Sequence, residues 1–85
     1  MKQSVIRSEW WYDDAAFYSD QRTLYLALLH VLTDGTATIQ VEQKFYSFAS
    51  EEEADIWLTS EEFRKVEYLA EDYGLTVIAP TSLPA

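Results

Sequence analysis

The sequence contains no cysteine, only two glycines and two prolines, and few basic residues. The lack of cysteine excludes disulfide bonds, thiolate catalysis and cysteine-ligated metal sites. Two glycines are too few for a glycine-rich loop that cradles phosphate groups. Because no Gly- or Pro-rich linker divides the chain, we expect its 85 residues to form a single domain, residues 1–85.

Basic residues are scarce relative to acidic ones: six Lys and Arg stand against fifteen Asp and Glu, which gives a formal net charge of −9. This imbalance disfavours direct nucleic-acid binding and docking on anionic membranes, since both need clustered cations. The longest apolar run, Leu24–Leu32, is broken by His30 and is too short to span a bilayer. With no signal-peptide core before Glu9 and no disulfides, we expect a cytoplasmic protein.

The residues that are present predict a folded domain, since 48% are hydrophobic and 15% are aromatic. Asp34-Gly35, between two apolar stretches, is typical of a two-residue hairpin loop. With that loop, His30 faces Ile39 and Leu28 faces Val41 on the core side of a sheet. Residues 22–32 also fit a helical stripe, and the agreement of these pairs favours the strand.

The expected fold is α+β: a small, mainly antiparallel sheet with two helices packed on one face, in the order β-β-β-α-α-β. Strands are expected near residues 4–12, 22–32, 36–48 and 75–79, while residues 15–21 fit either a short strand or a helical turn. Helices are expected near residues 51–58 and 60–73, because capping-box patterns begin at Ser50 and Thr59. Their apolar stripes point in different directions, which indicates two helices or one helix kinked near Thr59. Gly74 is the expected C-terminal cap.

No pattern typical of catalysis or metal binding is present. His30 is the only histidine, and local sequence places neither an acid nor a nucleophile beside it. The acidic pair Asp13-Asp14 lacks calcium-loop spacing, and Glu51–Glu53 is explained by the favourable effect of acids at a helix start. We therefore expect no enzymatic activity, cofactor or metal. A small-ligand or metal-assisted enzyme that uses His30 and Asp13-Asp14 is the weakest alternative.

The end of the expected helix 60–73 is unusual, because Glu67, Glu71 and Asp72 crowd a position where the helix dipole favours cations. Tyr68 is expected to lie exposed among them, as an aromatic anchor for a basic partner. In the run Trp10-Trp11-Tyr12, strand alternation would expose a tryptophan, and exposed aromatic residues mark interfaces. The predicted partner-binding residues are Glu61, Glu67, Tyr68, Glu71, Asp72 and Trp11.

These features predict a non-enzymatic protein-binding module, a small acidic adaptor or inhibitor that docks a carboxylate-rich helical face on a basic protein. A first alternative is a nucleic-acid mimic of the phage or mobile-element type, whose carboxylates replace phosphates in the groove of a DNA- or RNA-binding protein. A second alternative is a homo-oligomeric structural subunit, with a homodimer formed through the N-terminal aromatic strand.

Overall fold

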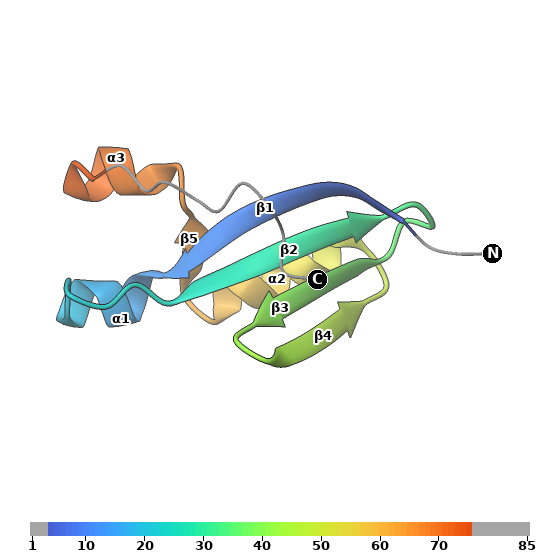
Figure 1. The fold of residues 1–85 in the computed structure, drawn as a ribbon, viewed down its shortest axis with the longest axis horizontal. Helices are drawn as coiled ribbons and strands as arrows, with labels where there is room; N and C mark the ends of the chain where they lie inside the picture. Colours follow the sequence, from blue (N-terminus) through green and yellow to red (C-terminus); the bar gives the residue numbers. More distant parts are fainter. Residues whose placement is uncertain (1–3, 76–85) are drawn as a thin grey trace.

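The structure, a computed structural model, describes residues 4–75, which form a five-stranded antiparallel sheet and three helices (Figure 1). The predicted α+β class with a small antiparallel sheet is confirmed. The strand order in the sheet is β4-β3-β2-β1-β5. The elements, in chain order, are β1 (Val5–Asp13), α1 (Asp14–Ser19), β2 (Leu26–Leu32), β3 (Ala37–Val41), β4 (Lys44–Phe48), α2 (Glu51–Ser60), β5 (Phe63–Lys65) and α3 (Tyr68–Tyr73).

Several element boundaries differ from those predicted. The ambiguous segment 15–21 lies mostly in α1, which begins after Asp13 because its Oδ1 accepts the Ala16 N–H at 3.0 Å. The predicted strand 36–48 is two strands, β3 and β4, separated by a turn at Glu42 and Gln43. The predicted strand 75–79 falls outside the described residues except for its first residue, which follows α3.

The hairpin between β2 and β3 forms where Asp34-Gly35 predicts it, but its loop is one residue longer. Leu32 N–H donates to Thr36 O at 2.9 Å, and Gly35, at φ +87°, ends a turn of three residues. Leu29 therefore faces Ile39, and His30 faces Thr38. The predicted register was wrong by one residue, which moves His30 to the face opposite the expected one.

Helix α2 is capped as predicted at its start and ends at Ser60, two residues beyond the predicted helix 51–58. Ser50 Oγ accepts the Glu53 N–H at 3.2 Å, and the Glu53 carboxylate accepts the Ala49 N–H at 3.1 Å. The second predicted cap was wrong, because the Thr59 hydroxyl donates back to the Asp55 carbonyl inside α2. The chain then turns through Glu62 at φ 64°, so the predicted helix 60–73 is replaced by β5 and the short helix α3.

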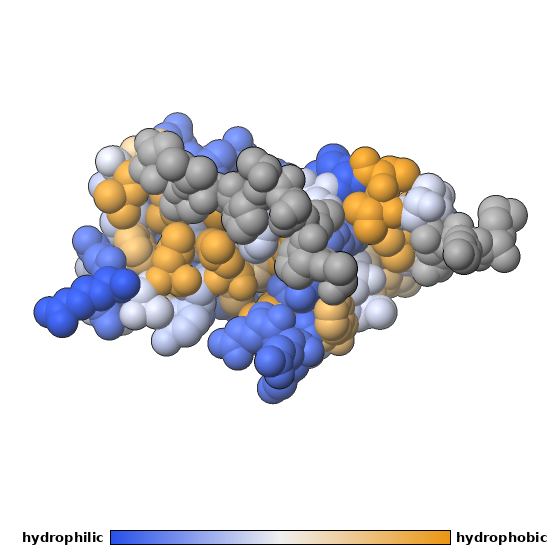
Figure 2. All heavy atoms as spheres, in the orientation of Figure 1, coloured by the Kyte–Doolittle hydropathy of each residue, from blue (hydrophilic) through white to orange (hydrophobic). Residues whose placement is uncertain are grey.

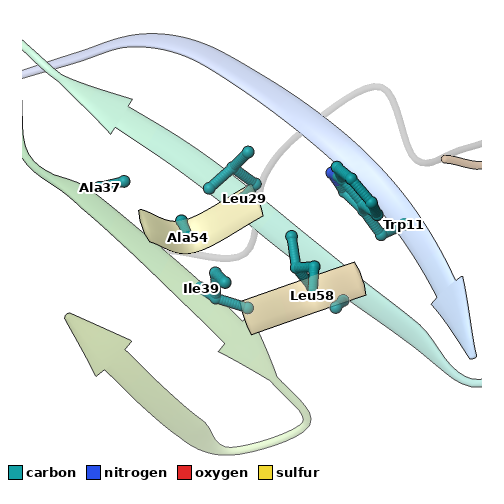
Figure 3. Packing of buried hydrophobic residues seen from close by; sticks show 7 residues of the cluster. Trp11, Leu29, Ala37, Ile39, Ala54 and Leu58 are labelled. Atoms are coloured by element: carbon teal, nitrogen blue, oxygen red, sulfur yellow. The ribbon is translucent and has the colours of Figure 1, made fainter. Parts of the chain in front are cut away.

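The larger hydrophobic core, named here the α2 cluster, lies between α2 and one face of β1, β2 and β3 (Figure 3). Alternate residues of the central strands point to this helix, and Leu29, Ile39 and Leu58 are fully buried. The cluster consists of Trp11, Ala27, Leu29, Ala37, Ile39, Ala54 and Leu58. Three partly exposed rings adjoin it, those of Phe48, Trp57 and Phe63.

A second core, named here the tyrosine cluster, is built on the opposite face at the end of the sheet where α1 and α3 lie (Figure 1). Its buried members are Tyr12, Phe17 and Leu69, from β1, α1 and α3. Tyr12 alternates with Trp11, so the two side chains point to opposite faces of β1. The prediction of helices on one face only was therefore wrong in this respect, since α2 and the α1–α3 pair cover different faces.

None of the helices in the described part of the chain is both long and apolar enough to cross a lipid bilayer.

Candidate functional site at the edge of the sheet

Trp11 was expected on the surface, and the structure places it in the α2 cluster with only 5% of its area exposed. Its indole Nε1 donates to Glu9 Oε1 at 2.9 Å, so its one polar atom is also paired. Residues 11–13 of β1 lie between β2 and β5 and offer no free edge. The expected exposure of Trp11 is therefore wrong, and only a small part of its ring reaches the surface.

The electrostatic setting of the predicted acidic residues differs from that expected. Because α3 begins at Tyr68, Glu67 lies at its N-cap and Glu71 lies in its first turn, where the helix dipole favours acids. The unfavourable crowding predicted at a helix C-terminus is thus wrong for both. Glu61, Glu67 and Glu71 are exposed, as expected.

Tyr68 is half-buried rather than exposed, and it lies against a cation. The Arg64 guanidinium lies 5.0 Å from the centre of the Tyr68 ring, and Arg64 Nε contacts Asp72 Oδ2 at 3.1 Å. Arg64 thus binds a ring and a carboxylate at once, and it ties β5 to α3. The sequence predicted Tyr68 and Asp72 on one helix, and the structure joins them to Arg64 of the neighbouring strand.

Strand β5 forms one edge of the sheet, and no strand within residues 4–75 pairs with its outer side. Asp14 N–H donates to Glu62 O at 3.0 Å, and Val66 N–H donates to Trp10 O at 3.1 Å. In an antiparallel ladder, alternate residues of a strand form hydrogen bonds with the neighbouring strand. Glu62 and Val66 bond to β1, so Arg64, which lies midway between them, also directs its N–H and C=O groups toward β1. Phe63 and Lys65 direct theirs outward, away from the sheet.

Two hollows follow this outer edge from one end of β5 to the other. The first, the α1 hollow, has a volume of about 540 Å³ and lies against α1, with Asp14, Tyr18 and Glu62 in its wall. The second, the Tyr68 hollow, has a volume of about 420 Å³, with Trp11, Lys65 and Tyr68 in its wall. Both are also lined by Thr59, Phe63 and Arg64, so they form one groove along the strand.

Asp14 positions the elements around this groove. Its Oδ1 accepts hydrogen bonds from the Tyr12 hydroxyl at 3.1 Å and from the Tyr73 hydroxyl at 3.0 Å. Burial, and then the bond to Asp14, raise the pKa of both phenols, which keeps them protonated as donors. The Phe17 ring lies edge-on to Tyr73 with centroids 4.9 Å apart, so α1 and α3 are joined by a carboxylate and by ring packing.

The hydrophobic residues of this end also reach the surface. In Figure 2, apolar residues gather between the positions of α1 and α3. Tyr18 in α1 is 77% exposed and forms part of the wall of the α1 hollow. An exposed aromatic ring beside a groove is typical of interaction surfaces.

The charge around the groove is negative, and its cations are already engaged. The carboxylates in its wall are those of Asp14 and Glu62, and four more lie at the C-cap of α2 (Glu61), at the N-cap of α3 (Glu67) and within α3 (Glu71 and Asp72). Arg64 contacts Asp72, and Lys65 Nζ lies 3.7 Å from Glu9 Oε2 and 5.9 Å from the centre of the Trp11 ring. The groove therefore offers carboxylates to a ligand, with the positive charges of β5 largely offset.

His30 lies on the open face of the sheet, where its Nδ1 is 2.9 Å from the Ser8 hydroxyl. No carboxylate lies within hydrogen-bond reach of this pair in the described residues. Among residues 4–75, no three His, Asp or Glu side chains are grouped to hold a metal ion. This part of the structure therefore gives no support to chemistry at His30 and Asp13-Asp14.

Sequence reasoning missed three features of the groove: β5 itself, the hollow at α1 and the left-handed turn at Glu62. Asp14 was noted as one of an acidic pair, but its two tyrosine partners are 2 and 59 residues away. Two glutamates in succession ahead of Phe63 gave no sign of a left-handed residue, because glycine is the usual signal.

Comparison of the chain with models of known protein families, with curated proteins and with solved structures finds no match.

Proposed function

We propose that this protein is a non-enzymatic binding module that docks a basic protein partner at the end of the molecule formed by α1, β5 and α3. The observation that carries the proposal is the charge of the groove along β5. The carboxylates of Asp14 and Glu62 lie in its wall, and its two cations are held by Asp72 and Glu9. Tyr18 supplies ring surface beside the two wall carboxylates, and Tyr68 supplies a ring in the second hollow, which suits a partner with lysine or arginine side chains.

A pair of charge-matched variants tests this proposal. Glu67→Lys with Glu71→Lys reverses two exposed carboxylates at the start of α3, while Glu42→Lys with Glu52→Lys makes the same change in net charge elsewhere. Asp72 is left intact because it holds Arg64. Both double variants and the wild type are used as bait for cellular proteins at low and high salt, and the bound proteins are identified and measured.

The expected result is a set of basic proteins bound by the wild type and by the Glu42/Glu52 variant, and lost by the Glu67/Glu71 variant. Binding by the wild type should weaken as salt is raised, since exposed charges are screened. Equal loss in both double variants would show that net charge matters and location does not. Unchanged binding by the Glu67/Glu71 variant would contradict the proposal.

A further inference from the structure

Within residues 4–75, the outer edge of β5 combines an unpaired backbone with a groove that runs along the strand. Phe63 and Lys65 turn their N–H and C=O groups outward, as derived above from the bonds to β1. The α1 hollow adjoins the start of β5 at Glu62, and the Tyr68 hollow adjoins its end at Lys65. A peptide laid along this edge meets main-chain donors and acceptors in its middle and a hollow at each end.

Two of the usual protections of a sheet edge, proline and a covering element, are missing from β5 within residues 4–75. Edge strands are also protected by shortness and by charged side chains. The sequence of β5 is Phe63-Arg64-Lys65, and it contains no proline. Its two cations are engaged in contacts within the chain. Arg64 contacts Tyr68 and Asp72, and Lys65 contacts Glu9 and Trp11. Within residues 4–75, the strand is short but not covered.

The chemistry of the α1 hollow selects one kind of side chain. Two carboxylates, those of Asp14 and Glu62, belong to its wall, together with the exposed ring of Tyr18. The one cation of that wall, Arg64, is paired with Asp72. A lysine or arginine side chain can place its charge near the carboxylates and its methylene groups against the Tyr18 ring.

We propose that the outer edge of β5 receives an extended segment of the partner as an added β-strand, with a lysine or arginine of that segment in the α1 hollow and an apolar side chain in the Tyr68 hollow. This proposal rests on the proposed function, because it names the binding mode and the chemistry of the same basic partner. Main-chain hydrogen bonds to Phe63 and Lys65 supply affinity, and the two hollows supply specificity.

The test separates the backbone of β5 from its side chains. Lys65→Pro removes the outward N–H of residue 65, while Lys65→Ala removes the same ammonium and keeps that N–H. The bonds to β1 involve residues 62, 64 and 66, so both variants keep them. A phage-displayed library of random dodecapeptides is selected on the wild-type protein, and the most enriched peptide is synthesised and its dissociation constant measured for all three proteins.

The expected outcome is an enriched sequence with a lysine or arginine at a fixed spacing from an apolar residue. Its affinity for Lys65→Pro should be about tenfold or more below its affinity for Lys65→Ala. The Glu67/Glu71 charge-reversed protein should also bind it more weakly, and this arm tests the proposed function alone. Equal affinity for Lys65→Pro and Lys65→Ala overturns the added strand but leaves the basic partner in place.

A second measurement tests the added strand through the backbone of the peptide, in case Lys65→Pro does not fold. Alternate backbone nitrogens of the selected peptide are methylated in two versions, one for each edge of an extended strand. Only one version should lose binding, because an added strand pairs through one edge. Equal behaviour of the two versions overturns the proposal. So does a failure to select any peptide, or a wild-type dimer that Lys65→Pro converts to a monomer, which would assign the edge to a second copy of the chain.

Discussion

The two cores of this small domain are built from different kinds of side chain. The α2 cluster joins a helix to the sheet through aliphatic side chains and Trp11, and Leu29, Ile39 and Leu58 are fully buried in it. The tyrosine cluster joins α1 and α3 to the other face through rings, and two of its hydroxyl groups bond to Asp14. Both cores adjoin the groove along β5, the first through Trp11 in the wall of the Tyr68 hollow and the second through Asp14 in the wall of the α1 hollow.

Substitutions in the two clusters should affect stability and binding to different extents. Apolar burial in the α2 cluster should set most of the free energy of unfolding, because it removes the most hydrophobic area from water. The tyrosine cluster depends on directional bonds, so changes there should disturb the groove at a smaller cost to the fold.

The largest loss of stability is expected for Leu58→Ala. Leu58 is fully buried between α2 and the sheet, so the substitution leaves a cavity and should lower the free energy of unfolding by about 2–5 kcal/mol. Urea denaturation followed by circular dichroism measures it. Ile39→Val, in the same cluster, serves as the milder control, at about 0.5–1.5 kcal/mol. A Leu58→Ala loss no larger than that control would contradict the assignment of the α2 cluster as the main core.

Asp14→Ala should have the next largest effect and should act on both properties. It leaves the buried Tyr12 hydroxyl without its acceptor, which should cost roughly 1–3 kcal/mol. It also removes a carboxylate from the α1 hollow, so binding of a basic peptide should weaken. Asp14→Asn keeps an acceptor oxygen and should recover most of the stability while recovering little of the binding. Full recovery of both properties by asparagine would show that the negative charge is not used.

Glu62→Gly should raise the free energy of unfolding and weaken binding of a basic peptide. Glu62 has φ 64°, a left-handed conformation that costs a non-glycine residue roughly 1 kcal/mol. Glycine removes that cost and also removes the carboxylate from the α1 hollow. Glu42 has φ 55° in the distant turn between β3 and β4, so Glu42→Gly is the matched control. It should stabilise the protein by a similar amount without changing peptide affinity, measured by thermal denaturation and fluorescence anisotropy.

The smallest effect is expected at Asp55, on the side of α2 that faces β1. Burial, and then the nearby Glu9 charge, raise the pKa of the Asp55 carboxyl above its ordinary value. The folded protein thus holds this proton more tightly than the unfolded chain does, so stability falls as the pH rises through the raised pKa. Asp55→Asn has no such proton to lose. The variant should gain stability relative to wild type between about pH 4 and pH 7, and a constant difference across that range would contradict the shift.

The sequence predicted those parts of the fold that carry local signals. The capping pattern of Ser50 and Glu53 predicted the start of α2, and Asp34-Gly35 predicted the position of the hairpin. Gly74 ends α3 with φ 70°, as expected. The register of that hairpin was wrong because Leu28 and Leu29 are both buried. A strand that is apolar on both faces does not reveal which face meets the helix, so loop length alone set the register.

The groove was only partly predictable, for a related reason. Strand β5 has three residues, too few to show any alternation, and its pairing with β1 joins positions fifty or more residues apart. Tyr68 and Asp72 were selected because a continuous helix would place Tyr68 among acidic residues at its C-terminal end. In the structure, both contact Arg64 across a strand and a separate helix. The two phenols that bond to Asp14 depend on the tertiary fold and left no local pattern.

The central claim is that partner binding is confined to the end of the molecule formed by α1, β5 and α3. Backbone amide chemical shifts, recorded by NMR while the library-selected peptide is added, test it most directly. We expect the changes to concentrate in residues 14–19 and 59–72, with Phe63 and Lys65 among the largest. The β3–β4 turn at Glu42 should not respond. Changes centred on that turn, or spread evenly over the sheet, would contradict the account.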